Sequence, residues 1–138
     1  MKIKLLSNTA QVPKKQRKGD AGFDLYAPVN EQINPHQTKQ IKLGVAIELS
    51  DDEVALTSER SSMAIKDNVD SIGNVIDSNY RGEISIILKN NSNFTKFIHQ
   101  GDRIGQLIVL KLANQSVEVV DTLTESERGE NAYGSSGK

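Results

Sequence analysis

The sequence predicts a single-domain, all-β protein of the sandwich or jelly-roll type. Its strongest periodic signal lies in residues 39–49, where Ile41, Leu43, Val45 and later apolar residues alternate with mostly polar or small ones, as in a half-buried strand. Short strand-like runs recur along the rest of the chain, separated by turn-forming pairs such as Asn-Pro and Asp-Asp. The 138 residues suffice for one buried core but not for two.

Each expected strand is a run rich in aliphatic residues that ends at turn-forming residues. The segment 71–83 forms two short strand pieces around a tight polar turn, and the segment 21–28 is an apolar run interrupted by Asp24. In chain order, the expected strands are 2–6, 21–28, 39–49, 53–58, the two pieces within 71–83, 82–90, 103–112 and 116–120.

Helix is expected only at residues 61–68, as two turns, because apolar residues repeat at helical spacing nowhere else over a useful length. From residue 122 onward the chain lacks periodicity and cannot bury much surface, so this tail is disordered when taken alone. We therefore expect a β domain over residues 1–121 and a flexible C-terminal arm over residues 122–138. The core of a lone sandwich of this size is thin, so burial between subunits would help.

The composition excludes several classes of protein. The 17 Lys and Arg residues balance 18 Asp and Glu residues, so net charge gives no general attraction to nucleic acid or to an anionic membrane. The absence of cysteine rules out disulfides and thiol catalysis. The N-terminus has no apolar signal segment, and no run of about 18 apolar residues occurs. These features predict a cytoplasmic protein that binds neither membrane nor nucleic acid stably.

Polar residues stand at positions where a plain β-protein needs none. Asp24 lies inside an apolar run, where an isolated carboxylate costs free energy unless a cation meets it; its structural alternative is a turn or edge aspartate. Arg60, Ser61 and Ser62 open the expected helix, where hydroxyls, free backbone N–H groups and an arginine can bind phosphate. Simple N-capping is the alternative there.

Three further places follow in the second half of the chain. Asp77 ends an apolar strand, which aims it rigidly, as a residue that orients a water must be; a hairpin turn with a surface tyrosine at Tyr80 is the alternative. Gln106 lies among apolar residues, and its amide needs partners. The tail 128–138 could wrap an anion with backbone donors, or be a floppy end. It is not a phosphate-binding P-loop, because no lysine follows Gly134.

Taken in order, these segments resemble the five motifs of the trimeric dUTPase family. The matching segments run from residue 21 to the C-terminus and read AGFDLYA, RSSMA, GNVIDSNYRGEI, GDRIGQLI and RGENAYGSSG. The resemblance implies a jelly-roll β-barrel, which agrees with the strand rhythm. It also implies a homotrimer with active sites shared between neighbouring subunits.

The resemblance further implies hydrolysis of dUTP to dUMP and pyrophosphate by attack of water on the α-phosphate, which limits uracil in DNA and supplies dUMP. Asp77 would hold and deprotonate the water, and Ser61 would donate to the bridging oxygen, where charge grows. Asp24 would hold Mg²⁺ through coordinated waters. The phosphate chain would be bound by Arg60, Ser62 and Gln106.

Base and sugar recognition follow from the same resemblance. Tyr80 would pack against the deoxyribose and exclude the 2′-hydroxyl of UTP, and strand-like backbone would read uracil. The arm would close over the nucleotide and exclude water. The uracil-binding residues would be Ser71, Gly73, Asn74 and Ile76, and the arm residues in contact with substrate would be Arg128, Tyr133, Gly134, Ser135 and Ser136.

The chain departs from the family pattern at several positions. Glu59 stands where a proline usually precedes the arginine of the second motif, and Ser71 stands where some relatives use asparagine. Tyr133 replaces a phenylalanine in the last motif, although a tyrosine ring can still stack.

Two alternatives to a dUTPase are a dCTP deaminase-type enzyme and a non-catalytic, nucleotide-sensing regulatory trimer. The deaminase branch needs a glutamate at position 87, and this chain has Ile87; it also typically carries tryptophan in place of Tyr80. A pure sensor has little use for the carboxylate of Asp77 beside the phosphate.

Overall fold

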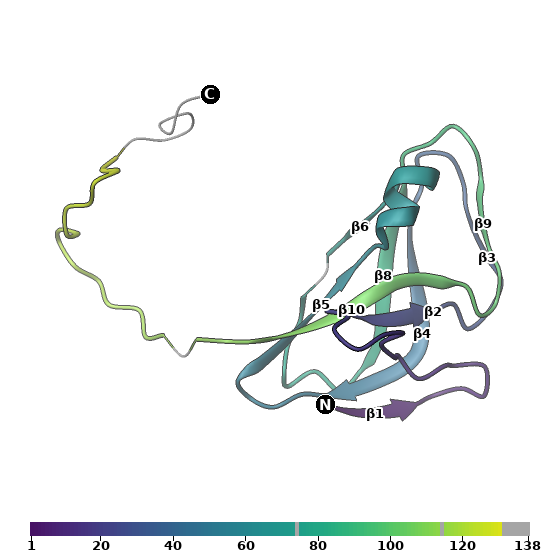
Figure 1. The fold of residues 1–138 in the computed structure, drawn as a ribbon, viewed down its shortest axis with the longest axis horizontal. Helices are drawn as coiled ribbons and strands as arrows, with labels where there is room; N and C mark the ends of the chain where they lie inside the picture. Colours follow the sequence, from purple (N-terminus) through teal and green to yellow (C-terminus); the bar gives the residue numbers. More distant parts are fainter. Residues whose placement is uncertain (74, 114, 131–138) are drawn as a thin grey trace.

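A computed structural model of the protein describes residues 1–73, 75–113 and 115–130. Two four-stranded antiparallel sheets and a two-stranded ribbon make up the body (Figure 1). One sheet has the order β1-β4-β8-β6, the other β2-β10-β5-β7, and β3 pairs with β9 in the ribbon. The strands are β1 (Lys2–Leu5), β2 (Phe23–Tyr26), β3 (Glu31–Ile33), β4 (Thr38–Glu48), β5 (Glu53–Ser58), β6 (Val69–Ile72), β7 (Val75–Ile76), β8 (Glu83–Asn90), β9 (Lys96–Ile98) and β10 (Arg103–Lys111).

Side chains of both sheets and of the ribbon meet in one aliphatic core. In β8, Ile84, Ile86 and Leu88 are buried while their neighbours are not, which is the alternation that the sequence predicts. Among the described residues, no aromatic side chain belongs to the buried core; Phe23 packs against its edge. This nearly all-β architecture confirms the predicted fold class and is consistent with the jelly-roll type, although the described strands do not close into one barrel.

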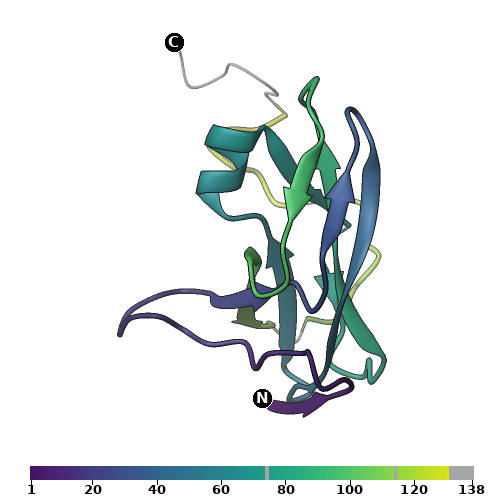
Figure 2. The ribbon, with the colours of Figure 1, turned by 90° about the vertical axis from the view of Figure 1, so that its right-hand side faces the viewer.

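The one helix of the described residues is η1 (Met63–Asp67), which lies at the opposite end of the body from β1 (Figures 1 and 2). It confirms the expected helix, but it is wound as a π-helix. Met63 is buried against the core, and Asn68, in the left-handed conformation, ends the helix with its N–H on the carbonyl of Met63. Ser62 makes no capping hydrogen bond, so N-capping does not explain its hydroxyl.

A β-bulge at Gly44 interrupts the pairing of β4 with β8. Gly44 has a φ of 66°, and a side chain there would collide with Ala10 and Ser7. Its N–H donates to Glu83 Oε1 over 2.9 Å, and its carbonyl accepts from the N–H of Leu6 over 2.7 Å. The bulge therefore fixes the start of β8 and the end of β1 at one point.

The segment beyond β10 runs away from the body (Figure 1). The expected strand at residues 116–120 is wrong, since residues 115–120 form no strand, and Val117 and Val119 are 96% and 95% exposed. The alternation that predicted it is present, but none of the described strands pairs with it to complete its hydrogen bonds. The division of the chain at residue 121 stays a prediction. None of the described residues form a helix of the length and apolarity that a membrane span requires.

Candidate active site

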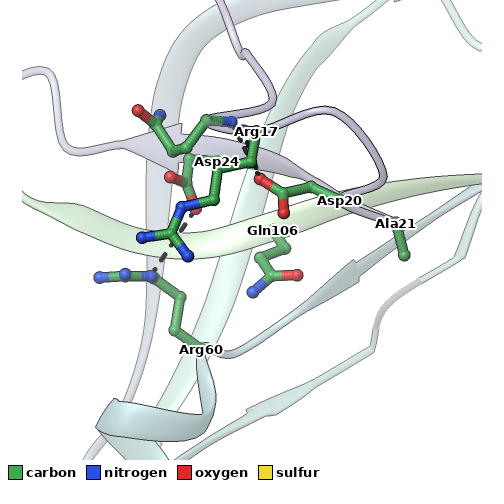
Figure 3. A pocket seen from close by; sticks show the side chains of 8 residues that line it. Arg17, Asp20, Ala21, Asp24, Arg60 and Gln106 are labelled. Atoms are coloured by element: carbon green, nitrogen blue, oxygen red, sulfur yellow. Dashed lines mark hydrogen bonds and ion pairs between the residues drawn. The ribbon is translucent and has the colours of Figure 1, made fainter.

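The first cavity brings together three residues predicted from separate segments. Its volume is about 300 Å³ (Figure 3). Asp24 on β2 lies opposite Gln106 on β10, and Gln106 in turn lies opposite Ser58 at the end of β5, two residues before Arg60. The central strand β10 thus gathers the predicted metal and phosphate residues. The lining residues are Gln16, Arg17, Asp20, Ala21, Gly22, Asp24, Arg60 and Gln106.

Asp24 is buried, with 7% of its surface exposed, and its carboxylate forms ion pairs with two arginines. Arg60 Nε lies 3.7 Å from Asp24 Oδ1, and Arg103 Nη1 lies 3.2 Å from Asp24 Oδ2. The expectation that an interior carboxylate needs a cationic partner is thereby confirmed. Arg103 is a partner of Asp24 that was not predicted; it appeared only within the motif GDRIGQLI. The signal that could have found it is its place at the start of the strand that carries Gln106.

The second cavity, of about 170 Å³, contains the predicted water-holding and sugar-binding residues. The turn that carries them is closed by the N–H of Tyr80, which donates to the carbonyl of Asp77 over 3.1 Å, and by Arg81, whose Nη1 donates to the carbonyls of Ser78 and Tyr80. The Tyr80 hydroxyl donates to the carbonyl of Glu83 over 3.0 Å, which fixes the ring. The lining residues are Thr57, Gly73, Val75, Ile76, Asp77, Tyr80, Glu83, Ile84 and Ser85.

Within the described part of the chain, these two cavities share no lining residue. Asp77 and Tyr80 therefore line a different cavity from Arg60, Asp24 and Gln106. A third cavity of about 220 Å³ contains Ser62 beside Arg60 and Arg103, and Ser61 is exposed at the start of the helix.

Several predicted residues belong to neither cavity. Ser71 is half-buried on β6, and Arg128 is exposed on the segment that leaves the body. Asn74, Tyr133, Gly134, Ser135 and Ser136 lie outside the described residues.

A family model described as dUTPase matches residues 8–137. The chain belongs to the dUTPase family. A deoxyuridine 5′-triphosphate nucleotidohydrolase of Clostridium tetani is 36% identical over 140 residues, covering 100% of this chain and 97% of that protein. One of Clostridioides difficile is 38% identical over 139 residues, covering 99% and 97%. A solved structure of the Staphylococcus bacteriophage 80alpha dUTPase with dUPNHPP has a TM-score of 0.94 at 27% identity, covering 99% of this chain and 98% of that one.

Family membership and the activity of these relatives show that the chain is a dUTP diphosphatase, which hydrolyses dUTP to dUMP and pyrophosphate. The predicted family and function are thus confirmed. dUTPases are typically trimeric and generally use Mg²⁺.

The first cavity fits a hydrated Mg²⁺. It is lined by the carboxylates of Asp20 and Asp24 and by the amide of Gln106, whose oxygens can accept hydrogen bonds from metal-bound waters. No group of three carboxylate or imidazole ligands occurs among the residues that the structure describes. Mg²⁺ keeps several waters and takes phosphate oxygens as ligands, so a dUTPase needs no all-protein cage for it.

Two of the departures from the dUTPase pattern, Glu59 and Ser71, contact each other. The Ser71 hydroxyl donates to Glu59 Oε2 over 2.7 Å, the Ser71 N–H donates to the same oxygen over 3.2 Å, and the Glu59 N–H donates to Ser71 Oγ over 3.1 Å. The hydroxyl of Ser71 holds the pKa of Glu59 below its ordinary value, and backbone N–H groups add to this effect. Glu59, which directly precedes Arg60, is thus hydrogen-bonded to strand β6.

We expect Ser71→Ala to lower the free energy of unfolding by about 1 kcal/mol at neutral pH, because it removes a hydrogen bond to a charged group. The folded-state pKa of Glu59 lies below the ordinary value of 4.5. Stability from this contact is therefore present above that pH and is lost as the pH falls through the folded-state pKa. Urea unfolding of both proteins at about pH 7 and about pH 3.5 should show the difference shrinking in acid. Ser71→Thr, which keeps the hydroxyl, is the control; an equal loss at both pH values would contradict the role of Glu59.

Proposed function

We propose that this dUTPase builds each active site from two neighbouring subunits of a homotrimer, one supplying the cavity of Asp77 and Tyr80 and the other the cavity of Arg60 and Gln106. The observation that carries the proposal is the separation of these two cavities within one chain. Hydrolysis needs the water-holding carboxylate beside the α-phosphorus and the phosphate ligands around the rest of the same triphosphate. Juxtaposition of two copies of the chain satisfies both needs.

In the proposed reaction, Asp77 accepts a hydrogen bond from the attacking water and takes its proton as the oxygen bonds to the α-phosphorus. The bond from the α-phosphorus to the bridging oxygen breaks, and the electron pair leaves with pyrophosphate. Ser61 donates to that bridging oxygen, where negative charge grows. Its exposed position at the helix start is compatible with this contact.

Arg60, Ser62 and Gln106 bind the phosphates in this proposal. Arg60 lines both the first and the third cavity, and Ser62 shares the third with it. Asp24 would hold Mg²⁺ through its waters, and the bound ion would offset the negative charge of the triphosphate.

Uracil is read by backbone groups of the segment from Ser71 to Ile76 in this proposal, with Asn74 included. The hydroxyl of Ser71 is already engaged by Glu59, which supports recognition through backbone rather than through that side chain. Gly73 and Ile76 line the second cavity, and Gly73 has a φ of 65°, which favours glycine. A mismatched donor pattern at such backbone groups would reject cytosine.

The C-terminal arm, residues 122–138, would close over the nucleotide of a site in the trimer. The segment beyond β10 leaves its own body, and the apolar side chains Val117 and Val119 on it are exposed, which supports contact with another subunit. Arg128 and the Ser135/Ser136 region would meet the γ-phosphate, with Gly134 beside them, and Tyr133 would stack on the base.

A substrate panel tests this assignment. Purified protein with Mg²⁺ should release pyrophosphate from dUTP but not from dCTP, dTTP or UTP. Tyr80→Ala should raise the ratio of UTP to dUTP hydrolysis by about tenfold to a hundredfold, because it opens space for a 2′-hydroxyl. Tyr80→Phe, which keeps the ring, is the matched control. Ammonia release from dCTP would instead support the deaminase, and dUTP binding without turnover would support the sensor.

A further inference from the structure

The loop between β1 and β2 carries a cluster of cations outside the five motif segments. Residues 14–18 read KKQRK, and this part of the chain projects from one side of the body (Figure 2). Arg17 of this loop lines the first cavity together with Asp20, Asp24 and Arg60, and Asp24 forms ion pairs with Arg60 and Arg103.

Hydrogen bonds fold this loop back over β2. The carboxylate of Asp20 accepts the N–H groups of Gln16 over 3.1 Å and of Arg17 over 2.8 Å. Gln16 Nε2 donates to the Tyr26 hydroxyl over 2.9 Å, and the N–H of Asp24 donates to the carbonyl of Lys14 over 2.9 Å. These hydrogen bonds thereby fix the backbone of Arg17, a residue that lines the first cavity.

Arg17 is the cation of this loop that lines the cavity with Asp24, Arg60 and Gln106. Figure 3 shows the side chains of Arg17 and Arg60 pointing toward the same part of the cavity, beside Asp24. Asp24 is already shared by Arg60 and Arg103. Across the described residues, no ion pair or side-chain hydrogen bond engages the Arg17 guanidinium. The planar guanidinium of Arg17, which lies beside a second arginine, can donate paired hydrogen bonds to phosphate oxygens.

We propose that Arg17 is a ligand of the β- and γ-phosphates of dUTP. The proposal rests on the proposed function, in which the first cavity takes the triphosphate. The α-phosphorus must lie beside Asp77, which belongs to the other cavity, so the cavity of Arg17 receives the outer phosphates. Arg17 therefore distinguishes dUTP from dUMP, the product that has lost these two phosphates.

Binding of nucleotides to Asp77→Asn protein in the presence of Mg²⁺, measured by titration calorimetry, tests this role without turnover. Adding Arg17→Ala should weaken dUTP binding about tenfold to a hundredfold and change dUMP binding less than about twofold, as expected for a lost charge-assisted phosphate contact. Lys18→Ala is the matched control, because it removes the same charge from the same loop but from a residue that does not line the cavity. It should change either affinity less than about threefold.

Equal effects of Arg17→Ala and Lys18→Ala on dUTP would overturn the proposal, since they would show only a general charge effect. Equal weakening of dUTP and dUMP by Arg17→Ala would overturn it as well. A separate Arg60→Ala variant distinguishes this from failure of the proposed function. If Arg60→Ala binds dUTP like the parent, the first cavity is not the phosphate site; if only Arg17→Ala is without effect, the phosphate site stands and Arg17 lies outside it.

Discussion

Asp77→Asn should lower kcat for dUTP hydrolysis by about a thousandfold while dUTP still binds. The amide matches the carboxylate in shape but cannot accept a proton from the attacking water, and a positioned general base contributes about 10²- to 10⁴-fold. Asp77 is exposed at the end of β7, so the substitution removes no core contact. Single-turnover hydrolysis and dUTP affinity, measured on the same preparation, separate the chemical step from binding.

The control for this substitution is Asp51→Asn, which makes the same chemical change at an exposed turn between β4 and β5. It should leave kcat within about twofold of the parent. An Asp77→Asn protein that turns over dUTP at the parental rate would remove Asp77 from the reaction, whatever happens to its affinity.

Two inactive variants should restore activity when they are assembled into one trimer. Asp77→Asn inactivates the second cavity, and Arg60→Ala inactivates the first. If each site takes one cavity from each of two subunits, a site is intact only where the Asp77 of one subunit faces the Arg60 of its neighbour. A ring of three subunits that contains both variants has one such junction, so about one site in three is intact. Co-expression with two tags and purification over both should therefore give about one third of the wild-type activity.

The control pairs Asp77→Asn with Asp77→Ala, which spoil the same cavity and so leave no intact site in any mixed trimer. Activity of the mixture no greater than that of the separate variants would show that both cavities of a site come from a single chain. Activity restored in the control pair would show that the Asp77 substitutions do not fully inactivate the second cavity.

The strands were predictable where one face is buried. In β8, contact of one face with a single core leaves a period of two in the sequence, whereas in β4 burial alternates only as far as Leu43 and is continuous from there to Ile47. The segment 116–120 carries the same alternation and forms no strand, because pairing depends on a neighbour and none of the described strands lies against it. Periodicity therefore predicts the capacity to form a strand, and the partner decides whether it forms.

The composition of the site was only partly predictable. The interior position of Asp24 predicts a cation, but its partner Arg103 follows from the placement of β10 beside β2, which local sequence does not encode. Glu59 and Ser71 were separate departures from a motif, and nothing in the sequence says that they contact each other across two strands. The two cavities on which the proposed site rests likewise appear only once the strands are placed.

The all-aliphatic core gives this molecule an unusual optical behaviour. The chain has no tryptophan, and none of its described rings are buried in the core. Tyr26 bonds to Gln16 at the first cavity, and Tyr80 lines the second. Among the described residues, tyrosine emission therefore originates beside the two cavities of the proposed site, whereas the packed interior contributes none. The intrinsic fluorescence of this enzyme should follow occupancy by nucleotide more closely than it follows loss of interior packing.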